Sequence, residues 1–527
     1  MLYFVGTNIC THKGAAGMFI KYYMSGGHMY ARLLEAKRDE NGARYDVLHC
    51  HLGRVIDEEK GFFKSRDRGA FKYSLGEGFC DIDDTDAQTT LTHEPKTKSM
   101  LILDFGPEYV FAEALKKEGI WDIFMSIAPK KADTLMTLIL HNMLWTEACQ
   151  YAEDFWRTSY ASIAFPNAKL KSQRISEFLE ELGDEAVYRE FFDAYLKYTV
   201  SKSGTSRHSI IVDSTGLPND CRMDLTAVNV HRGAQSNEVR LIFAVDRATG
   251  FPLYFRYVKG SILDVNSLQN TIAGLKHYGI DVDHCLVDAG YYCGDNIESL
   301  NALNIPYLLR LRAGNNIYDG LLEKYIDGLD AHENRVLYGN RVVFIKCVPI
   351  EFHSGQAFAY VAIDYDVQSD ERRRIYMKNQ GEFASKAEMD VKLKNAGAFI
   401  LVSKIEVGVN EILPLYYSRQ TIEQAFDFEK NYANLLPLRK HGEKTFRGHI
   451  LISFMSAVSI MIINRLFINA HPRAKNKKPF SFIQARSCLR QMKCQVYDDQ
   501  VLVAEPDRKS NEILKALKVG YARAISR

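Results

Sequence analysis

The 527-residue sequence predicts an α/β protein built around a mixed β-sheet. Between residues 209 and 311, short apolar segments alternate with segments of helical spacing, a pattern typical of α/β folds. A stretch at 336–365 that is rich in β-branched and aromatic residues interrupts this pattern, which then resumes. Hydrophobic residues make up 46% of the chain and charged residues 25%, which is enough to build a sizeable core.

The first 200 residues are expected to form a hairpin followed by helices. Residues 30–37 and 44–52 have the composition of paired strands, and Asn41-Gly42 lies between them, where positive φ is tolerated. Residues 121–192 are mostly helical in spacing. We therefore treat residues 1–200 as a hairpin and helical region.

The segment from residue 209 onward is expected to form the core of the protein. Apolar strands are predicted at 209–212, 239–245, 253–257, 285–287 and 307–311, and helices at 265–278 and 296–303. The order β-β-β-α-β-α-β is that of the ribonuclease-H-like fold, in which acidic side chains lie on the first strand and just after the fourth. Residues 201–312 and 396–468 are therefore expected to form a ribonuclease-H-like core with a mixed sheet.

Two further segments are expected around this core. Residues 313–395 are predicted to form a β-rich insertion, after which a strand at 399–402 and a long helix near 415–432 resume the core. Residues 469–527 form a basic C-terminal region, with 13 Lys or Arg against 5 Asp or Glu. This excess fits either a contact with a polyanion or a solvated tail, and the net charge of +2 for the whole chain favours neither.

Two features bear on the compartment. The ten cysteines include no C-x-x-C pair and the chain starts without a signal pattern, so we expect free thiols in the cytoplasm. Residues 450–463 are strongly apolar but contain Ser453, Ser456 and Ser459. Because this segment is shorter than the ~20 residues of a membrane-spanning helix, we expect a buried core helix and no membrane contact.

Three acidic residues stand out by their context. Asp213 and Asp288 each follow an apolar strand, and Glu423 lies on the helix after the insertion. Such carboxylates can hold two divalent cations that activate a water or a 3′-hydroxyl in phosphoryl transfer, and hard oxygen ligands suit Mg²⁺. Taken singly, each Asp could be a turn residue before Gly216 or Gly290, and the Glu a solvated charge.

The predicted helix at 415–432 strengthens this interpretation. Tyr416, Arg419, Glu423 and Lys430 follow one another at offsets of 3, 4 and 7, which keeps them on one stripe of a helix. A metal-binding carboxylate beside an Arg and a Lys that hold phosphates is what a DNA-cutting site requires. The alternative is an exposed charged helix face.

These residues resemble a known family. The spacing Tyr416-x2-Arg419-x3-Glu423-x6-Lys430 resembles the Y-R-E-K signature of bacterial insertion-sequence transposases of the DDE type. Residues 210–216 and 287–292 resemble the two Asp motifs of that family, and 446–450 resemble the segment after the signature. The resemblance covers about residues 209–467, and more loosely the N-terminal hairpin and helices.

The resemblance implies a catalytic triad of Asp213, Asp288 and Glu423 that holds two Mg²⁺ or Mn²⁺ ions. The other signature residues would bind DNA phosphates: Tyr416, Arg419 and Lys430. It also implies cut-and-paste transposition, with strand cleavage and strand transfer at terminal inverted repeats, target DNA as a second substrate, and a homodimer in the synaptic complex. Residues 1–200 would bind the DNA ends, and the protein would be a bacterial, cytoplasmic, nucleoid-associated one.

The sequence departs from some relatives in its insertion. In those relatives the insertion carries a tryptophan that stacks near a flipped base, whereas the three tryptophans here all precede the core. A stacking role would fall to an aromatic residue such as Phe344, Phe352 or Tyr360. Three other interpretations remain open: a nuclease of the same fold without strand transfer, an inactive DNA-binding protein derived from a transposase, and a structural protein with chance matches.

Overall fold

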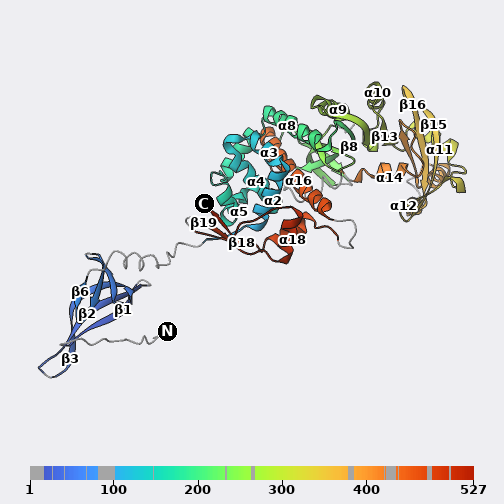
Figure 1. Cartoon of the computed structure of the whole chain (residues 1–527). Helices are drawn as coiled ribbons and strands as arrows, with labels where there is room; N and C mark the ends of the chain where they lie inside the picture. Colours follow the sequence, from blue (N-terminus) through green and yellow to red (C-terminus); the bar gives the residue numbers. More distant parts are fainter. Residues whose placement is uncertain are drawn as a thin grey trace. The chain divides into compact units, whose positions relative to one another are not determined.

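The computed structural model divides the chain into two compact units, one within residues 1–99 and one within 100–527 (Figure 1). It describes residues 17–25, 28–40, 42–66, 68–80, 101–145, 147–231, 234–262, 267–377, 385–420, 422, 435–436, 438–471, 478–497 and 500–526. Each unit has its own cluster of buried hydrophobic side chains. The N-terminal unit and the C-terminal unit are therefore separate bodies, each with a core.

The N-terminal unit is a six-stranded antiparallel sheet whose strands neighbour one another in chain order. The strands are β1 (Met18–Ser25), β2 (His28–Arg38), β3 (Arg44–Asp57), β4 (Phe62–Ser65), β5 (Gly69–Ser74) and β6 (Gly78–Cys80). The expected hairpin is confirmed as β2 and β3, which are both longer than predicted. Ile20, Leu33, Phe63 and Phe71 belong to the buried cluster of this sheet.

The C-terminal unit is built on a ten-stranded mixed sheet. The strands run in the order β11-β10-β8-β12-β13-β17-β16-β15-β14, and β9 pairs with β10. Their bounds are β8 (Arg207–Pro218), β9 (Ala227–His231), β10 (Ala234–Asp246), β11 (Pro252–Lys259), β12 (Asp281–Val287), β13 (Tyr307–Arg310), β14 (Arg335–Tyr338), β15 (Arg341–Phe352), β16 (Gly355–Asp364) and β17 (Ala398–Ser403).

Five of these strands form the expected ribonuclease-H-like core. β8, β10 and β11 are antiparallel, whereas β12 runs parallel to β8, and β13 runs parallel to β12. Helices α9 (Leu268–His277) and α10 (Gly294–Ala302) connect the parallel strands. The mixed α/β fold class and the predicted order of elements are confirmed, with β9 as an addition.

The first core strand is longer than predicted. A strand at 209–212 was expected to end at Asp213, but β8 continues to Pro218. Asp213 pairs with Phe243 and therefore lies inside the strand. The prediction was wrong because the half-buried polar residues 213–216 break the apolar pattern, while their backbones remain hydrogen-bonded to β10.

The inserted segment 313–395 extends the core sheet and also contains helices. Its strands β14, β15 and β16 join the core through β17, so they do not form a separate sheet. Its helices are α11 (Asn316–Tyr325), α12 (Tyr365–Met377) and α13 (Lys386–Lys394). After β17, α14 (Ile412–Tyr417) begins the segment in which a long helix was predicted, and most of that prediction lies outside the described residues.

A helical layer covers the start of the sheet. Its members are α2 (Gly106–Glu118), α3 (Ile120–Ile127), α4 (Ala132–Leu144), α5 (Ala152–Thr158), α6 (Ala161–Ala164), α7 (Ser172–Leu182), α8 (Glu185–Ser203) and α16 (Glu443–Ala470). The helical prediction for 121–192 is confirmed. α16 packs against α7 and α4, and Figure 1 shows it next to α4.

α16 holds the layer together. Among the described helices it alone is long and apolar enough to cross a membrane, but 78% of its apolar window is buried in the protein. Ser456 and Ser459 donate hydrogen bonds to backbone oxygens one turn earlier, at 2.8 and 2.7 Å, so their hydroxyls are satisfied inside the core. These features fit the buried core helix that the sequence predicted, although the helix is longer than the apolar segment.

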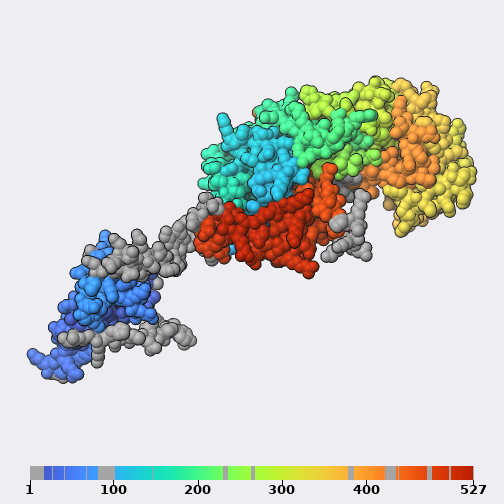
Figure 2. Space-filling view, viewed as in Figure 1, coloured from blue at the N-terminus to red at the C-terminus, as the bar shows by residue number. Residues whose placement is uncertain are grey.

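The described part of the basic C-terminal region is folded. α17 (Phe482–Leu489), β18 (Lys493–Val496), β19 (Gln500–Val503), α18 (Arg508–Ala516) and β20 (Ala524–Ser526) follow in order. β18 pairs with β7 (Leu101–Asp104), and in Figure 2 the red C-terminal residues lie against the cyan residues of the same unit. Arg490 donates to the Leu144 carbonyl oxygen at 3.1 Å, at the C-terminal end of α4. This region is therefore not a solvated tail.

Candidate active site

Two of the three expected acids lie side by side. β8 and β12 are parallel neighbours, and Val212 pairs with Val287. Asp213 and Asp288 follow this pair directly, with extended backbone at Asp288. Paired positions in parallel strands are about 4.8 Å apart and point their side chains to the same face. The two carboxyl groups therefore lie on one face, at the edge where β12 ends.

Asp213 lies where β8 leaves the core. Ile211 and Val212 before it are buried, whereas residues 213–216 are half-buried. Its Oδ1 accepts a hydrogen bond from the Ser214 backbone N–H at 2.8 Å. An apolar strand thus holds the carboxylate firmly while leaving it accessible from solvent.

Asp288 is contacted by two residues from the Y-R-E-K pattern. Its Oδ1 lies 2.8 Å from Arg419 Nη1 and accepts a hydrogen bond from Tyr416 Oη at 3.4 Å. The Asp288 side chain is 40% exposed and the Arg419 side chain 26%. The guanidinium also lies 5.3 Å from the centre of the Tyr416 ring. Residues 128 or more positions apart in the sequence therefore meet at one carboxylate.

Tyr416 is a buried hydrogen-bond donor at this carboxylate. Burial raises the pKa of Tyr416 to about 12, while Arg419 opposes the rise and Asp288 adds to it. The phenol is therefore protonated at neutral pH, and its hydroxyl can donate to Asp288.

The local backbone at 416–419 differs from the prediction. We expected Tyr416 and Arg419 on one continuous helix, but α14 ends at Tyr417 and Arg419 follows in a turn. The Arg419 N–H donates to the Tyr416 carbonyl oxygen at 3.3 Å, which closes this turn. Glu423 and Lys430 lie outside the described residues, so the structure places neither of them. Within the described ranges, no group of three or more His, Cys, Asp or Glu is arranged to hold a metal.

Two arginines beside the strands that carry the acids were not predicted from the sequence. Arg240 of β10 lies opposite Gly216, and its Nη1 donates to Ser214 Oγ at 3.3 Å, so it belongs to the sheet face opposite to the Asp213 side chain. Arg310 ends β13 and is close enough to Tyr416 to lower its pKa, against the larger effect of burial. An arginine inside the apolar segment 239–245 was the available signal for the first of them.

Gly216 is required by packing and not by a turn. A Cβ at Gly216 would lie 2.3 Å from Glu238 Oε2. Glu238 is buried, and its Oε1 accepts a hydrogen bond from Asn229 Nδ2 at 2.7 Å. The missing side chain of Gly216 therefore makes room for a buried carboxylate in the sheet beyond Asp213.

Two of the three aromatic residues proposed for base stacking are core residues. Phe352 is fully buried and stacks on Tyr292 with ring centres 5.9 Å apart. Tyr360 is fully buried and its hydroxyl donates to the Val407 carbonyl oxygen at 2.7 Å. Phe344 is half-buried against Tyr365. Phe352 and Tyr360 were therefore wrong candidates.

The insertion does touch the site segment through another aromatic pair. The Tyr338 ring of β14 stacks on the Tyr417 ring of α14, with centres 5.1 Å apart. The Arg341 guanidinium lies 5.1 Å from the Tyr417 ring and pairs with Asp364 at 3.0 Å. The far edge of the sheet is thus joined to the residue beside Tyr416.

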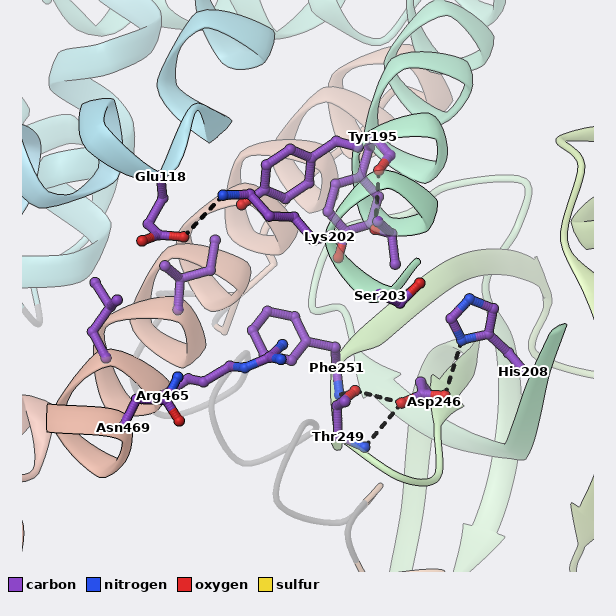
Figure 3. Close-up of a pocket in the computed structure, with 14 residues that line it drawn as sticks. Glu118, Tyr195, Lys202, Ser203, His208, Asp246, Thr249, Phe251, Arg465 and Asn469 are labelled. Atoms are coloured by element: carbon purple, nitrogen blue, oxygen red, sulfur yellow. Dashed lines mark hydrogen bonds and ion pairs between the residues drawn. The ribbon is translucent and has the colours of Figure 1, made fainter. Parts of the chain in front are cut away.

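A cavity of about 380 Å³ lies at the other end of β8 (Figure 3). His208 lies five residues before Asp213, which is roughly 16 Å along a strand. Several polar groups in the cavity already have partners: Lys202 pairs with Glu118 at 3.2 Å, and His208 contacts Asp246 at 3.0 Å, while the Arg465 guanidinium lies over the Phe251 ring. The cavity is therefore separate from the acidic pair.

Asp246 is the anchor of this second cluster. Its carboxylate accepts hydrogen bonds from His208 Nδ1 at 3.0 Å and from the Thr249 N–H at 2.9 Å (Figure 3). Burial alone would raise the pKa of Asp246, but the hydrogen bonds from His208 and Thr249 outweigh it and hold the pKa below its usual value. These contacts fix the turn between β10 and β11.

The chain matches the model of one protein family and is distantly similar to solved structures that include two transposase complexes. No curated protein is significantly similar in sequence to this chain. The piggyBac transposase synaptic complex with hairpin DNA is 10% identical, over 73% of this chain and 76% of that one, with a TM-score of 0.36. The Drosophila P element transposase strand transfer complex is 10% identical, over 72% of this chain and 97% of that one, with a TM-score of 0.19.

The family match covers the acidic site. The matched segment contains Asp213, Asp288, Tyr416 and Arg419, together with Glu423 and Lys430. Residues 206–459, which are 254 of the 527 residues, match the family described as the transposase DDE domain.

Proposed function

We propose that this protein is a transposase that cleaves and transfers DNA strands at the terminal inverted repeats of its own insertion sequence. The observation that carries the proposal is the pairing of Val212 with Val287, which brings Asp213 and Asp288 together on one sheet face. The match of residues 206–459 to the transposase DDE domain supports it independently. Glu423, the acid of the Y-R-E-K pattern, completes the proposed triad.

The donor chemistry of the proposed triad fits a divalent metal. Asp213, Asp288 and Glu423 offer carboxylate oxygens, which Mg²⁺ and Mn²⁺ accept as ligands. Two such ions, when bound, supply charge neutralisation and an activated water or 3′-hydroxyl for phosphoryl transfer. The contacts of Asp288 are made through Oδ1 and its side chain is 40% exposed, so the carboxylate remains approachable.

Arg419 and Tyr416 have complementary proposed roles. Arg419 neutralises Asp288 in the protein alone and, being partly exposed, can transfer its hydrogen bonds to a DNA phosphate oxygen. Tyr416 was expected to bind a DNA phosphate, but it is buried and its hydroxyl donates to Asp288, so we propose instead that it orients the Asp288 carboxylate. Lys430 is proposed as a further phosphate contact.

The proposed partners follow from the reaction. The two ends of an element must be cut and joined to target DNA together, so we propose a homodimer that pairs the ends in a synaptic complex. The N-terminal region would help to bind the ends, and the reaction would take place on bacterial DNA in the cytoplasm.

The proposal is tested with a duplex that carries the inverted repeat from the flank of the gene. With Mg²⁺ and target DNA, the wild-type protein is expected to give cleaved ends and joined products. Asp213→Asn, Asp288→Asn and Glu423→Gln should lose both products, whereas Asp283→Asn on β12, an exposed partner of Arg207, should retain them. Cleavage without joining would show a nuclease, and binding without either product would show an inactive DNA-binding protein.

A further inference from the structure

The sheet of the N-terminal unit has two faces of different character. Ile20, Ala31 and Leu33 are buried in the core cluster on one face. Since side chains alternate along a strand, Lys21, Tyr23, Tyr30 and Arg32 project from the opposite face. Arg32 and Lys21 are exposed and both tyrosines are half-buried. Over residues 21–23 and 30–32, the face turned away from the core is thus built from cations and aromatic rings, whereas the next pair along it, Phe19 and Leu34, is apolar and buried.

The strand register extends this face across four strands. Lys21 pairs with Arg32 across β1 and β2. In the next row, Tyr23 pairs with Tyr30, Tyr30 with Arg54 and Arg54 with Lys64, from β1 to β4. Neither row of described residues contains an aspartate or a glutamate. We call this surface the tyrosine–arginine face: Lys21, Tyr23, Tyr30, Arg32, Arg54 and Lys64.

The aromatic rings are already arranged as a stack. The Tyr23 and Tyr30 rings are stacked, with centres 5.9 Å apart and planes at 26°. The Arg32 guanidinium lies over the Tyr23 ring at 4.3 Å from its centre. The Arg32 guanidinium covers the Tyr23 ring, and this planar group together with the Tyr30 ring offers a surface on which nucleotide bases can stack at little cost in side-chain ordering.

We infer that the tyrosine–arginine face binds single-stranded DNA. Unpaired bases would stack on the Tyr30 ring and on the Arg32 guanidinium that the Tyr23 ring supports, and phosphates would lie along the exposed cations Lys21 and Lys64. A duplex hides its base faces, so it cannot use the rings in this way. The choice of DNA rests on the proposed function, because strand cleavage at an element end leaves unpaired DNA beside the protein.

The inference is tested by binding of a fluorescein-labelled oligo(dT) to the full-length protein without divalent metal. Tyr23→Ala and Tyr30→Ala should each weaken binding about tenfold, as expected for loss of one stacked base. Tyr30→Phe should bind like the wild type, since the ring remains. Arg32→Ala and Lys64→Ala should weaken binding and reduce its salt dependence.

Two control variants test whether binding depends on the tyrosine–arginine face or on other exposed residues of the N-terminal unit. Tyr45→Ala removes a tyrosine that is 49% exposed on β3 but outside both rows, and Lys60→Ala removes an exposed cation from the β3–β4 turn. Both should bind oligo(dT) like the wild type. Circular dichroism should show the same fold in all variants, because the substituted residues are on the solvent side.

The outcomes distinguish this inference from the proposed function. Asp213→Asn should bind oligo(dT) normally even where DNA cleavage is lost, and a protein without cleavage activity could still show the tyrosine dependence. Unchanged binding in the double variant Tyr23→Ala, Tyr30→Ala would overturn the inference. So would tighter binding of a duplex of equal length, or much tighter binding of oligo(U) than of oligo(dT).

Discussion

Asp246 and Glu108 show two opposite ways in which this protein handles a buried carboxyl group. Asp246 is 5% exposed and accepts hydrogen bonds from His208 and Thr249, which keep it ionised. Glu108 is also 5% exposed, in the first turn of α2, and among the described residues its Oε2 has no hydrogen-bond partner. The same side-chain chemistry therefore gives opposite responses to pH.

Replacing Asp246 should destabilise the protein. Asp246→Ala removes the buried acceptor of the hydrogen bonds from His208 and Thr249, and leaving such groups unsatisfied typically costs about 1–3 kcal/mol. The folded pKa of Asp246 is depressed, so its contribution is present above its unfolded pKa and is lost as pH falls through the folded pKa. Urea unfolding at pH 7 should show the loss, and it should shrink on acidification. Asp283→Ala, at an exposed ion pair, should change stability by about 1 kcal/mol or less.

Replacing Glu108 should stabilise the protein at alkaline pH. Burial raises the pKa of Glu108 from 4.5 to about 7, so the protonated form is favoured in the fold. Below pH 4.5, Glu108 is protonated in both the folded and the unfolded protein, and the free energy of unfolding is at its full value. As pH rises through about 7 the buried carboxyl group ionises, and about 3 kcal/mol of that free energy is lost. Glu108→Gln should therefore unfold at higher urea than wild type at pH 8 but not at pH 4.5. An equal midpoint at both pH values would contradict this.

At the scale of elements, the apolar sequence patterns predicted the strands and helices, whereas the contacts of the polar residues could not be predicted. The order of strands and helices from β8 to β13 could be predicted because each element buries apolar residues at its own period. The full length of β8 could not, because its polar half is stabilised by pairing with β10. The contact of Arg419 with Asp288 could not be derived from helical spacing, because a turn follows α14. The burial of Phe352 depends on packing against Tyr292, which spacing does not reveal.

The contact between α7 and α16 gives a prediction at this scale. A Cβ at Gly448 would lie 2.0 Å from the Leu179 carbonyl oxygen, and one at Gly183 would lie 1.8 Å from the Lys444 carbonyl oxygen. Gly448→Ala must push two helices apart and should destabilise by about 1–3 kcal/mol or more. Gly320→Ala in α11 meets nothing within 4 Å and should stabilise by about 0.5–1 kcal/mol, because alanine is the better helix former. Thermal unfolding of both variants tests the contrast, and similar effects would contradict it.

At the scale of the whole molecule, the two ends of the C-terminal unit are joined. β18 pairs with β7, and α17 packs against α2, so residues after 478 complete a layer that begins at residue 101. Some of the positively charged residues of this region have partners within the unit: Arg490 donates to the Leu144 carbonyl oxygen, and Lys493 pairs with Asp104.

Truncation tests whether the C-terminal region stabilises the rest of the C-terminal unit. Removal of residues 471–527 uncovers the β7 edge and the α2 surface, so the shortened protein should be cleaved rapidly in limited proteolysis and unfold at a lower temperature. Lys509→Ala removes an exposed charge without shortening the chain and should behave like wild type. A truncated protein as stable as the wild type would show that the region is an accessory tail.

The hydrogen-bonded ladder that runs from β11 to β14 has a mechanical consequence. The inserted segment 313–395 is not a separate lid. Its strand β16 pairs with β17 of the core, and its Tyr338 ring stacks on Tyr417, close to the acidic site. The outer strands and the strands that lead to Asp213 and Asp288 belong to one hydrogen-bonded sheet, so a displacement of β14 relative to β12 requires the sheet to twist or its strand pairs to separate. Among the described strands, the insertion and the acidic pair are therefore mechanically coupled through backbone hydrogen bonds.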